Sequence, residues 1–422
     1  MREDAVSPDL MSADHIECPY RLYRELHRGS GVAEDAGVGV VVAGYQDLVA
    51  LARKTELYSS SLTSDGKGPR HMGVGPEPVQ ADVEEILSHA HPVTNALFTA
   101  DPPVHTRHRK LISTALGPRR VRSLEPAIRR IANDLVDGFI DSGEVDLLPR
   151  FAIPLPVTVI SDILGVDRAD MATFKHWGDM MIAGNIDVLS HEQRREVAHA
   201  VVAFHAYFVP RIEERRARPV DDLLSDMINA ETEGEGKLST AELLPIISQI
   251  LLAGHETTTN LIGNAIMVLL RDAALMARLR ERPELIEAFV EEMLRFDPPI
   301  QCTYRRVTAA ATLRGVPLQP GQMVVPLWAA AGWDPSVFEN PEKFDVGRAN
   351  VRQHMGFGYG PHFCAGAELA RVEARVAFET LLGRLDDIAL DEGASDLRHL
   401  PSFASHGYRR LVLRFRERAP AG

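Results

Sequence analysis

One cysteine, Cys364, stands in a glycine-rich segment directly before a helical pattern; residues 357–366 read Phe-Gly-Tyr-Gly-Pro-His-Phe-Cys-Ala-Gly. The free N–H groups and the dipole at a helix N-terminus lower the pKa of a thiol, and the thiolate is the form that ligates iron. Gly358 and Gly360 lack a Cβ, so the backbone there can turn tightly and approach a flat cofactor. We therefore interpret Cys364 as a metal ligand; the alternative is a buried cysteine in an ordinary turn.

An acid and a hydroxyl, Glu256 and Thr257, interrupt a long apolar segment. A buried carboxylate is costly unless it has a partner, so Glu256 needs an explanation. One explanation is a satisfied hydrogen bond to the backbone or to an arginine. The other is proton delivery, because an acid beside a hydroxyl in a dry site can relay protons from water.

His105 and Arg109 follow the helix-start sequence Asp-Pro-Pro at residues 101–103, and their spacing of four places them on one helix face. That face could clamp an anion, although a solvated basic surface has the same pattern. Residues 102–124 contain six arginines and lysines and no acidic residue. The acidic chain therefore carries a basic island, from chance clustering or as a docking face.

A long helix and several shorter elements are expected to position these groups. A capping box, Ser239 to Glu242, opens an apolar segment that runs to about Leu270. At about 1.5 Å per residue such a helix is roughly 40–50 Å long, and we expect it to be buried. Further helices are expected at residues 19–26, 45–57, 83–90, 283–295 and 368–375, and a turn with a strand at residues 37–43. The interval from Ser60 to Asp101 is mostly irregular and is expected to be a lid, a binding loop or a disordered segment.

Composition limits the class of protein. The chain has 422 residues, a net charge of −13 and three cysteines, too few for a disulfide framework. No run of about 18 apolar residues suggests a membrane span, and the negative charge argues against nucleic acid as a partner. We expect one domain over residues 1–422, monomeric and cytoplasmic, with residues 1–18 loosely ordered.

The pattern Phe-x-x-Gly-x-x-x-Cys-x-Gly at residues 357–366 resembles the haem-binding loop of the cytochrome P-450 superfamily. Ala-Gly-His-Glu-Thr at residues 253–257 and Asp-Pro-Pro-x-His-x-x-x-Arg at residues 101–109 resemble two further signatures of that family. The resemblance runs from about Pro19 to Phe415. It implies a cytochrome P-450 fold, mainly α with a minor β portion.

The resemblance also implies roles for single residues. Cys364 would ligate the iron of haem b (iron protoporphyrin IX), the family being known for a thiolate axial ligand. Thr257 would contact bound oxygen and Glu256 would act as the acid. The haem propionates would be held by His105, Arg109, Arg305 and His362, with Arg306 as the fallback for Arg305 and His354 as a weaker candidate.

Two further groups of residues are implied. Glu292, Arg295 and Arg348 match the family's Glu-x-x-Arg motif and its third member, a structural triad that would pin the segment before Cys364. The substrate pocket would be lined, by analogy and spacing, by Leu97, Phe98, Ile250, Ala253, Ile300, Thr303 and Phe403. One departure from the family pattern, Gly332-Trp333 in place of Asn-Arg, leaves the packing of that loop open.

The implied activity is that of a haem-thiolate monooxygenase that takes electrons from ferredoxin and ferredoxin reductase, with dioxygen as co-substrate. It would hydroxylate a small apolar substrate such as a terpenoid, steroid, fatty acid or aromatic compound. The basic island would then be the docking face for the acidic ferredoxin. The alternatives are a peroxide-driven peroxygenase, which would not need Glu256 and Thr257, and a non-catalytic haem sensor or carrier.

Overall fold

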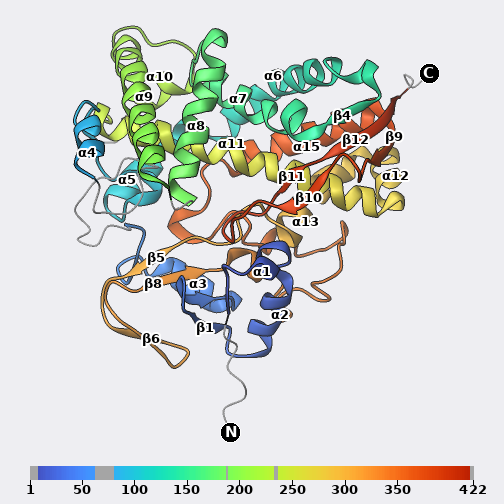
Figure 1. Ribbon diagram of the computed structural model, residues 1–422, viewed down its shortest axis with the longest axis horizontal. Coiled ribbons are helices and arrows are strands. Elements are labelled where there is room, and N and C mark those ends of the chain that lie inside the picture. Colours follow the sequence, from blue (N-terminus) through green and yellow to red (C-terminus); the bar gives the residue numbers. More distant parts are fainter. Residues whose placement is uncertain (1–7, 62–79, 187–188, 232–235, 419–422) are drawn as a thin grey trace. The chain divides into compact units, whose positions relative to one another are not determined.

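The computed structural model describes residues 8–61, 80–186, 189–231 and 236–418 (Figure 1). Part of the expected loop between Ser60 and Asp101 lies outside these residues. Contacts divide the chain into two compact units. Unit 1 comprises Met1–Ser60, Ser123–Pro156 and Thr257–Gly422, and unit 2 comprises Ser61–Arg122 and Val157–Glu256.

Unit 1 holds the strands. A five-stranded sheet has the order β1-β2-β8-β5-β3, in which only β2 and β8 are parallel. Its strands are β1 Val32–Asp35, β2 Gly39–Val42, β8 Met323–Pro326, β5 Arg305–Val307 and β3 Tyr58–Ser59. The other strands are β4 Glu144–Asp146, β12 Val412–Glu417 and β9 Leu385–Leu390 in one sheet, and the pairs β6 Ala311–Leu313 with β7 Val316–Leu318 and β10 Asp396–His399 with β11 Tyr408–Arg410.

Apolar clusters cover both faces of the five-stranded sheet. Val41 of β2 packs with the helix α2 (Tyr20–Arg28), whereas Val40 and Val42 pack with the helix α3 (Tyr45–Arg53). Successive side chains of a strand point to opposite faces, so an uninterrupted apolar strand is expected when both faces are buried. The sequence Gly39–Val42 therefore forms a two-sided core strand.

The helices of unit 1 are α1 Ala13–Glu17, α2 Tyr20–Arg28, α3 Tyr45–Arg53, α12 Ala273–Glu281, α13 Ile286–Phe296, α14 Trp328–Ala331 and α15 Ala367–Arg384. Pro283 starts a short 3-10 turn, Pro283–Leu285, and not the α-helix that was expected to begin there. In the N-terminal segment, residues 8–17 are described and include the short helix α1. Leu10 is fully buried and its N–H donates to Asp35 over 2.8 Å.

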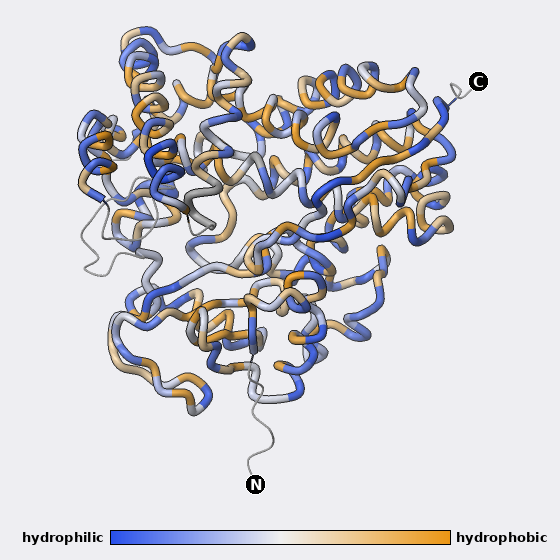
Figure 2. The backbone as a smooth tube through the Cα atoms, in the orientation of Figure 1, coloured by the Kyte–Doolittle hydropathy of each residue, from blue (hydrophilic) through white to orange (hydrophobic). Residues whose placement is uncertain are grey.

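Unit 2 is helical in its described part (Figure 1). Its helices are α4 Ala81–Leu87, α5 Val104–Ala115, α8 Met171–Ile186, α9 His191–Ala217 and α10 Leu223–Asn229. Three helices belong to both units, α6 Pro118–Asp137, α7 Pro154–Ile163 and α11 Thr240–Arg271. Hydrophobic and hydrophilic residues alternate along the helices (Figure 2), as expected where one face is buried. The expectation of a mainly α fold with a minor β portion is confirmed.

The long helix α11 has 32 residues and is therefore about 48 Å long. The backbone N–H and the hydroxyl of Ser239 donate to Glu242 over 2.8 and 2.7 Å, so the expected capping pair starts the helix. Pro245 lies in the first turns and does not interrupt them. Proline has no N–H to donate to the Ala241 carbonyl one turn earlier, and that carbonyl accepts instead from the Thr94 N–H over 3.1 Å.

Candidate active site

The segment that carries Cys364 is a tight loop before α15. The N–H of Cys364 donates to the Phe357 carbonyl over 2.9 Å, and α15 begins three residues later, after the N-cap Gly366. Gly358 and Gly360 have φ of 72° and 75°, the left-handed region that favours glycine. A Cβ on Gly360 would also lie 3.0 Å from the Ala52 carbonyl oxygen. The glycines therefore have the turn role that the sequence predicts.

The Cys364 thiol is half-buried, in contrast to Cys302, which is 2 % exposed and lies in an apolar cluster. Burial raises the pKa of the Cys302 thiol far above its usual range. A thiol of that kind does not ionise at neutral pH, and so it is a poor metal ligand. Cys18 is exposed, and none of the three cysteines is in a disulfide.

Both ends of the Cys364 loop are tied to one buried carboxylate, Glu291 of α13. His354 lies before the loop and donates from Nε2 to Glu291 over 3.2 Å; Arg371 lies after it on α15 and donates over 2.5 Å. Burial would raise the pKa of Glu291, but the hydrogen bonds from His354 and Arg371 outweigh it and lower that pKa to about 2. Glu291 therefore stays ionised and holds the loop from both sides.

His354 thus belongs to this network. Its Nδ1 accepts from the Gly356 N–H over 3.1 Å, so Nε2 carries the proton that faces Glu291. The side chain is 2 % exposed. Both ring nitrogens of His354 thus have hydrogen-bond partners within the protein. His354 is therefore not suited to bind a haem propionate, for which it was the weaker candidate.

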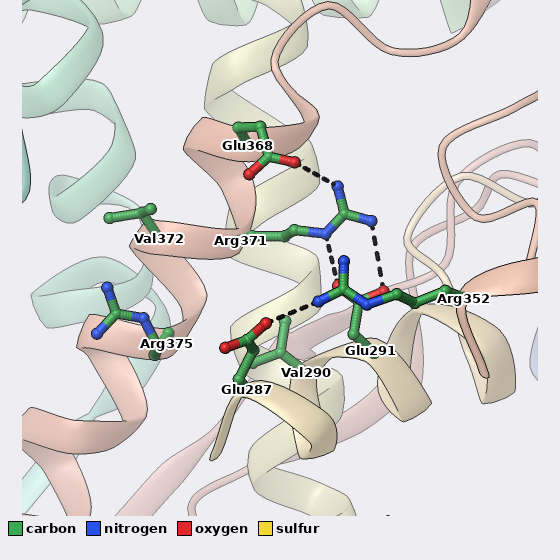
Figure 3. A pocket seen from close by; sticks show the side chains of 8 residues that line it. All are labelled: Glu287, Val290, Glu291, Arg352, Glu368, Arg371, Val372 and Arg375. Atoms are coloured by element: carbon green, nitrogen blue, oxygen red, sulfur yellow. Dashed lines mark hydrogen bonds and ion pairs between the residues drawn. The ribbon is translucent and has the colours of Figure 1, made fainter. Parts of the chain in front are cut away.

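A polar pocket lies between α13 and α15 (Figure 3). It is lined by Glu287, Val290, Glu291, Arg352, Glu368, Arg371, Val372 and Arg375. Arg352 donates to Glu287 over 2.7 Å, and Arg371 donates to Glu368 over 3.2 Å in addition to Glu291. Since its guanidinium groups are matched by carboxylates, this pocket is a seam of ion pairs and is not suited to an apolar substrate.

The structure brings Glu292, Arg295 and Arg348 together. Arg295 binds Glu292 with two hydrogen bonds of 2.9 and 2.8 Å, and Arg348 donates to the same carboxylate over 3.2 Å. Glu292 and Arg295 are completely buried. Arg295 also donates to the Gly332 and Pro341 carbonyls over 2.7 and 2.8 Å, so it joins α13 to the segment that leads to Cys364.

The departure at Gly332-Trp333 has a packing explanation. A Cβ on Gly332 would lie 2.1 Å from the Arg295 carbonyl oxygen, so no larger residue fits there. Trp333 donates from its indole N–H to the Phe296 carbonyl over 2.8 Å and stacks on Tyr20 with ring centroids 4.6 Å apart. This loop is thus packed against the end of α13.

The other anion-binding candidates of unit 1 are half-buried. His362 lies 3.0 Å from the Ser60 hydroxyl through Nε2. Arg305 is on β5 and donates to the Tyr304 carbonyl over 2.7 Å. Arg306 is the next residue of the same strand, so its side chain points to the opposite face from that of Arg305. Only one of Arg305 and Arg306 can therefore face a given ligand.

In unit 2, His105 and Arg109 lie one turn apart on α5, His105 buried and Arg109 half-buried. The basic island is partly neutralised within the unit. Arg107 pairs with Glu242, and Arg120 pairs with Asp221 over 2.5 Å. The exposed cations of the island in the described structure include Lys110, Arg119 and Arg122.

The middle of α11 is less buried than the sequence indicates. Ala253 is exposed and Glu256 and Thr257 are half-buried, although Leu251 is 1 % and Thr258 is 2 % exposed. The protein residues around α11 thus enclose Glu256 and Thr257 only in part at this point. Partial exposure of an acid and a hydroxyl suits groups that exchange protons with a ligand or with water.

Gly254 has a packing role in the same stretch. A Cβ there would lie 2.7 Å from the Ile160 side chain of α7. Glycine at this position therefore lets α7 approach α11 closely within unit 2.

The buried carboxyl next to this stretch is Glu373 of α15, which the sequence interpretation missed. It is 2 % exposed and lies 3.0 Å from the Thr258 hydroxyl. Burial raises the pKa of Glu373 to about 8, although the hydrogen bond from Thr258 lowers it. In the sequence Glu373 stands among alternating acidic and basic residues and is typical of a surface helix, so no signal there could have identified it.

The remaining pocket candidates belong partly to unit 1 and partly to unit 2. In unit 1 the Ile300–Ser405 bridge brings Ile300 and Thr303 near the segment of Phe403. The Thr303 hydroxyl accepts from the Trp328 indole over 2.8 Å, and Phe403 packs edge-on against Tyr304. In unit 2 the candidates are Leu97, buried, Phe98, 40 % exposed, and Ile250 and Ala253 of α11.

Comparison with known proteins places these features in one family. The family model described as cytochrome P450, written P-450 here, matches residues 162–395. The chain belongs to the cytochrome P-450 family. A 6-deoxyerythronolide B hydroxylase of Saccharopolyspora erythraea is 36 % identical over 412 residues, 96 % of this chain and 98 % of the relative. This cytochrome P-450 is therefore a monooxygenase, an oxidoreductase.

Solved structures agree with the fold. The cytochrome P-450 CYP109Q5 of Chondromyces apiculatus is 34 % identical with a TM-score of 0.84, covering 98 % of this chain and 99 % of that one. CYP109E1 of Bacillus megaterium, in complex with corticosterone, is 31 % identical with a TM-score of 0.81, covering 95 % and 99 %. The expected cytochrome P-450 fold is confirmed.

Family membership implies a haem cofactor and the use of dioxygen. The residues present fit a thiolate-bound haem: Cys364 is accessible beside the N-terminus of α15, and Gly358 and Gly360 carry no side chain toward it. Among the described helices none is by itself long and apolar enough to cross a membrane, although the bent pair α11 and α12 meets that test by length and composition.

Proposed function

We propose that this cytochrome P-450 hydroxylates an apolar organic substrate, with haem b as cofactor and electrons from a ferredoxin and its reductase. The observation that carries the proposal is the half-buried Cys364 in a glycine loop held at both ends by Glu291. When bound, haem supplies a thiolate-ligated iron that activates dioxygen. A rigid loop keeps the sulfur in place, since its two anchors cannot move independently.

The other roles follow from the residue chemistry. Arg109, Arg305, His105 and His362 would hold the two propionates, and guanidinium groups suit carboxylates because they can bind them with two parallel hydrogen bonds. The Thr257 hydroxyl would contact the bound dioxygen and donate a proton there. Glu256 would pass protons from water to Thr257. Both side chains are half-buried, so they can contact the site and still exchange protons.

The substrate class rests on the pocket and on the relatives. Leu97, Phe98, Ile250, Ala253 and Ile300 are apolar, and Phe403 adds a second aromatic ring. Two of the similar proteins, a 6-deoxyerythronolide B hydroxylase and a structure in complex with corticosterone, support a steroid among the classes considered and add a macrolide to them. The cytoplasmic location and the monomeric state stay predictions.

The thiolate assignment is tested by the absorption spectrum of the reduced, carbon-monoxide-bound protein. We expect a strongly red-shifted Soret band for the wild type and its loss in Cys364→Ser. Cys302→Ser is the matched control, because Cys302 is buried in an apolar cluster, and it should keep the band. A wild-type band at the wavelength of histidine-ligated haem would refute the proposal.

The oxidant that supports product formation distinguishes a monooxygenase from a peroxygenase. A monooxygenase forms product from dioxygen with ferredoxin, ferredoxin reductase and a reduced nicotinamide, and Thr257→Ala weakens that reaction. A peroxygenase forms product from hydrogen peroxide alone, with little dependence on Thr257. Corticosterone serves as the first probe substrate in both assays.

A further inference from the structure

One strained turn in unit 2 carries two of the pocket candidates. The turn 96–99, defined as Ala96 to Thr99, contains the short 3-10 helix Leu97–Thr99. Leu97 has φ of 43°, a left-handed conformation that a leucine rarely adopts. Strain of this kind persists where surrounding contacts fix it, and it concentrates at ligand-binding sites.

Two buried side chains fix this turn through its backbone. The Leu97 N–H donates to Nδ1 of His108 over 3.3 Å, and the Phe98 N–H donates to Oε1 of Gln249 over 3.2 Å. The amide nitrogen of the same Gln249 donates to the Ala96 carbonyl over 2.9 Å. His108 is 0 % and Gln249 is 2 % exposed, so water does not compete for these hydrogen bonds.

His108 is itself oriented by a carboxylate. Its Nε2 donates to Glu242 over 3.0 Å, which leaves Nδ1 as the acceptor for Leu97. Burial lowers the pKa of His108 more than Glu242 raises it, so the ring is neutral and keeps that acceptor. Glu242 and Gln249 are seven residues apart on α11, about two turns, and so lie on the same helix face.

We infer that His108 and Gln249 are positioning residues that fix the turn 96–99 and thereby determine which apolar substrates the enzyme selects. The inference rests on the proposed function, because Leu97 and Phe98 are proposed pocket residues. Phe98 is 40 % exposed although it is a large apolar side chain, and its backbone N–H is held by Gln249. Fixing the Phe98 backbone limits the positions that its ring can reach from this turn.

The variants remove or retain single hydrogen bonds. Gln249→Leu removes both bonds of Gln249, whereas Gln249→Glu keeps the acceptor for Phe98 and loses the donor to Ala96. His108→Leu removes the acceptor for Leu97, whereas His108→Asn keeps an acceptor near the position of Nδ1. Ser248→Ala is the control, because Ser248 is buried beside Gln249 on α11 and contacts Met181.

The first measurement is hydrogen–deuterium exchange of the peptide that contains residues 96–99. It reads the turn directly and needs neither substrate nor turnover. We expect exchange at least ten-fold faster in Gln249→Leu and His108→Leu, intermediate rates in Gln249→Glu and His108→Asn, and wild-type rates in Ser248→Ala. Unchanged exchange in Gln249→Leu and His108→Leu would overturn the inference. If those two do not fold, the same criterion applies to Gln249→Glu and His108→Asn.

The second measurement is the selectivity between apolar probes, starting with corticosterone and dodecanoic acid, from titrations of the haem spin state. We expect the ratio of the two dissociation constants to change at least five-fold in Gln249→Leu and to return toward the wild-type ratio in Gln249→Glu. Faster exchange with an unchanged ratio would overturn the inference, because the turn would then be held without determining selectivity.

Failure of the proposed function gives a different result. It would show as a wild type without the red-shifted Soret band, or as a haem spin state that no apolar probe shifts. The exchange experiment would still decide whether His108 and Gln249 fix the turn. Without a proposed pocket, however, the selectivity claim would be withdrawn.

Discussion

The Thr258 hydroxyl donates a hydrogen bond of 3.0 Å to Glu373 and joins α11 to α15 within unit 1. Both side chains are 2 % exposed, and the second carboxylate oxygen of Glu373 has no partner among the described residues. Burial raises the pKa of this carboxyl to about 8. Glu373 therefore carries a proton at neutral pH. Its partner Thr258 is the residue that follows Thr257 on α11.

Glu373→Gln should make the protein less sensitive to alkaline pH. Between the unfolded pKa of 4.5 and the folded pKa of about 8 the folded state binds more protons, so the free energy of unfolding falls as pH rises. Glutamine keeps an acceptor for Thr258 and cannot ionise. From pH 6 to pH 8 the variant should gain roughly 2–3 kcal/mol relative to the wild type in denaturant titrations. Parallel pH curves for the two proteins would contradict this prediction.

Glu291→Gln should loosen the Cys364 loop. The change leaves Arg371 without its buried carboxylate, and breaking such a pair costs about 3 kcal/mol or more. Because the pKa of Glu291 is lowered to about 2, its stabilisation is present above pH 4.5 and is lost as pH falls toward 2. The measurements are the free energy of unfolding at pH 7 and pH 4 and the fraction of haem retained.

Glu287→Gln is the control for this prediction. Glu287 lines the same pocket (Figure 3), but its pair with Arg352 is exposed, 63 % and 64 %, and such pairs contribute less than about 1 kcal/mol. Equal losses in the two variants would mean that Glu291 does not hold the loop as argued.

Gly332→Ala should be strongly destabilising, because the new methyl group would lie 2.1 Å from the backbone oxygen of Arg295. Backbone on both sides must shift, and we expect a loss of about 2–4 kcal/mol. Gly383→Ala is the opposite case. A Cβ there meets nothing within 4 Å inside α15, so alanine should be neutral or stabilising by up to about 1 kcal/mol. Thermal unfolding of both variants checks the pair.

The triple variant Lys110→Glu, Arg119→Glu, Arg122→Glu should slow electron delivery from a ferredoxin. These exposed cations would attract an acidic donor, and opposite charge raises the association rate by about ten-fold or more at low salt. The apparent rate of reduction should fall by that factor at low ionic strength and approach the wild-type rate in 0.5 M salt. Arg278→Glu, an exposed residue of α12, should change little. An equal fall in the reduction rate for the triple variant and for Arg278→Glu would show that the basic island is not the docking face.

The parts of the fold and site that were predictable from sequence depend on local rules. The turn at Gly358 and Gly360 needs positive φ, the capping pair Ser239–Glu242 starts a helix, and apolar periodicity marks α2 and α3. Each of these signals lies within a few residues. The triad Glu292, Arg295 and Arg348 could be proposed because two of its members are one turn apart and the family motif supplies the third.

The missed parts depend on which distant segments meet. Glu373 is buried because α15 packs against Thr258, 115 residues away, and nothing near Glu373 indicates that contact. His354 is hydrogen-bonded to Glu291, 63 residues away. The sequence near His354 does not indicate this bond, so His354 remained a candidate ligand of a propionate. Gln249 bonds to Ala96 and Phe98, more than 150 residues away, and no residue near it in the sequence indicates that contact.

Two neighbouring threonines of α11 allow a decisive test of the proton pathway. Thr257 is half-buried, whereas Thr258 is buried and bonded to Glu373. Thr257→Ala should lower the fraction of consumed electrons that appear in hydroxylated product by several-fold. Thr258→Ala should instead lower stability by about 1–2 kcal/mol, since Glu373 loses its partner. Product yield per electron, measured with the probe that shifts the spin state, distinguishes the two. If Thr257→Ala kept the wild-type yield, the hydroxyl would have no part in proton delivery.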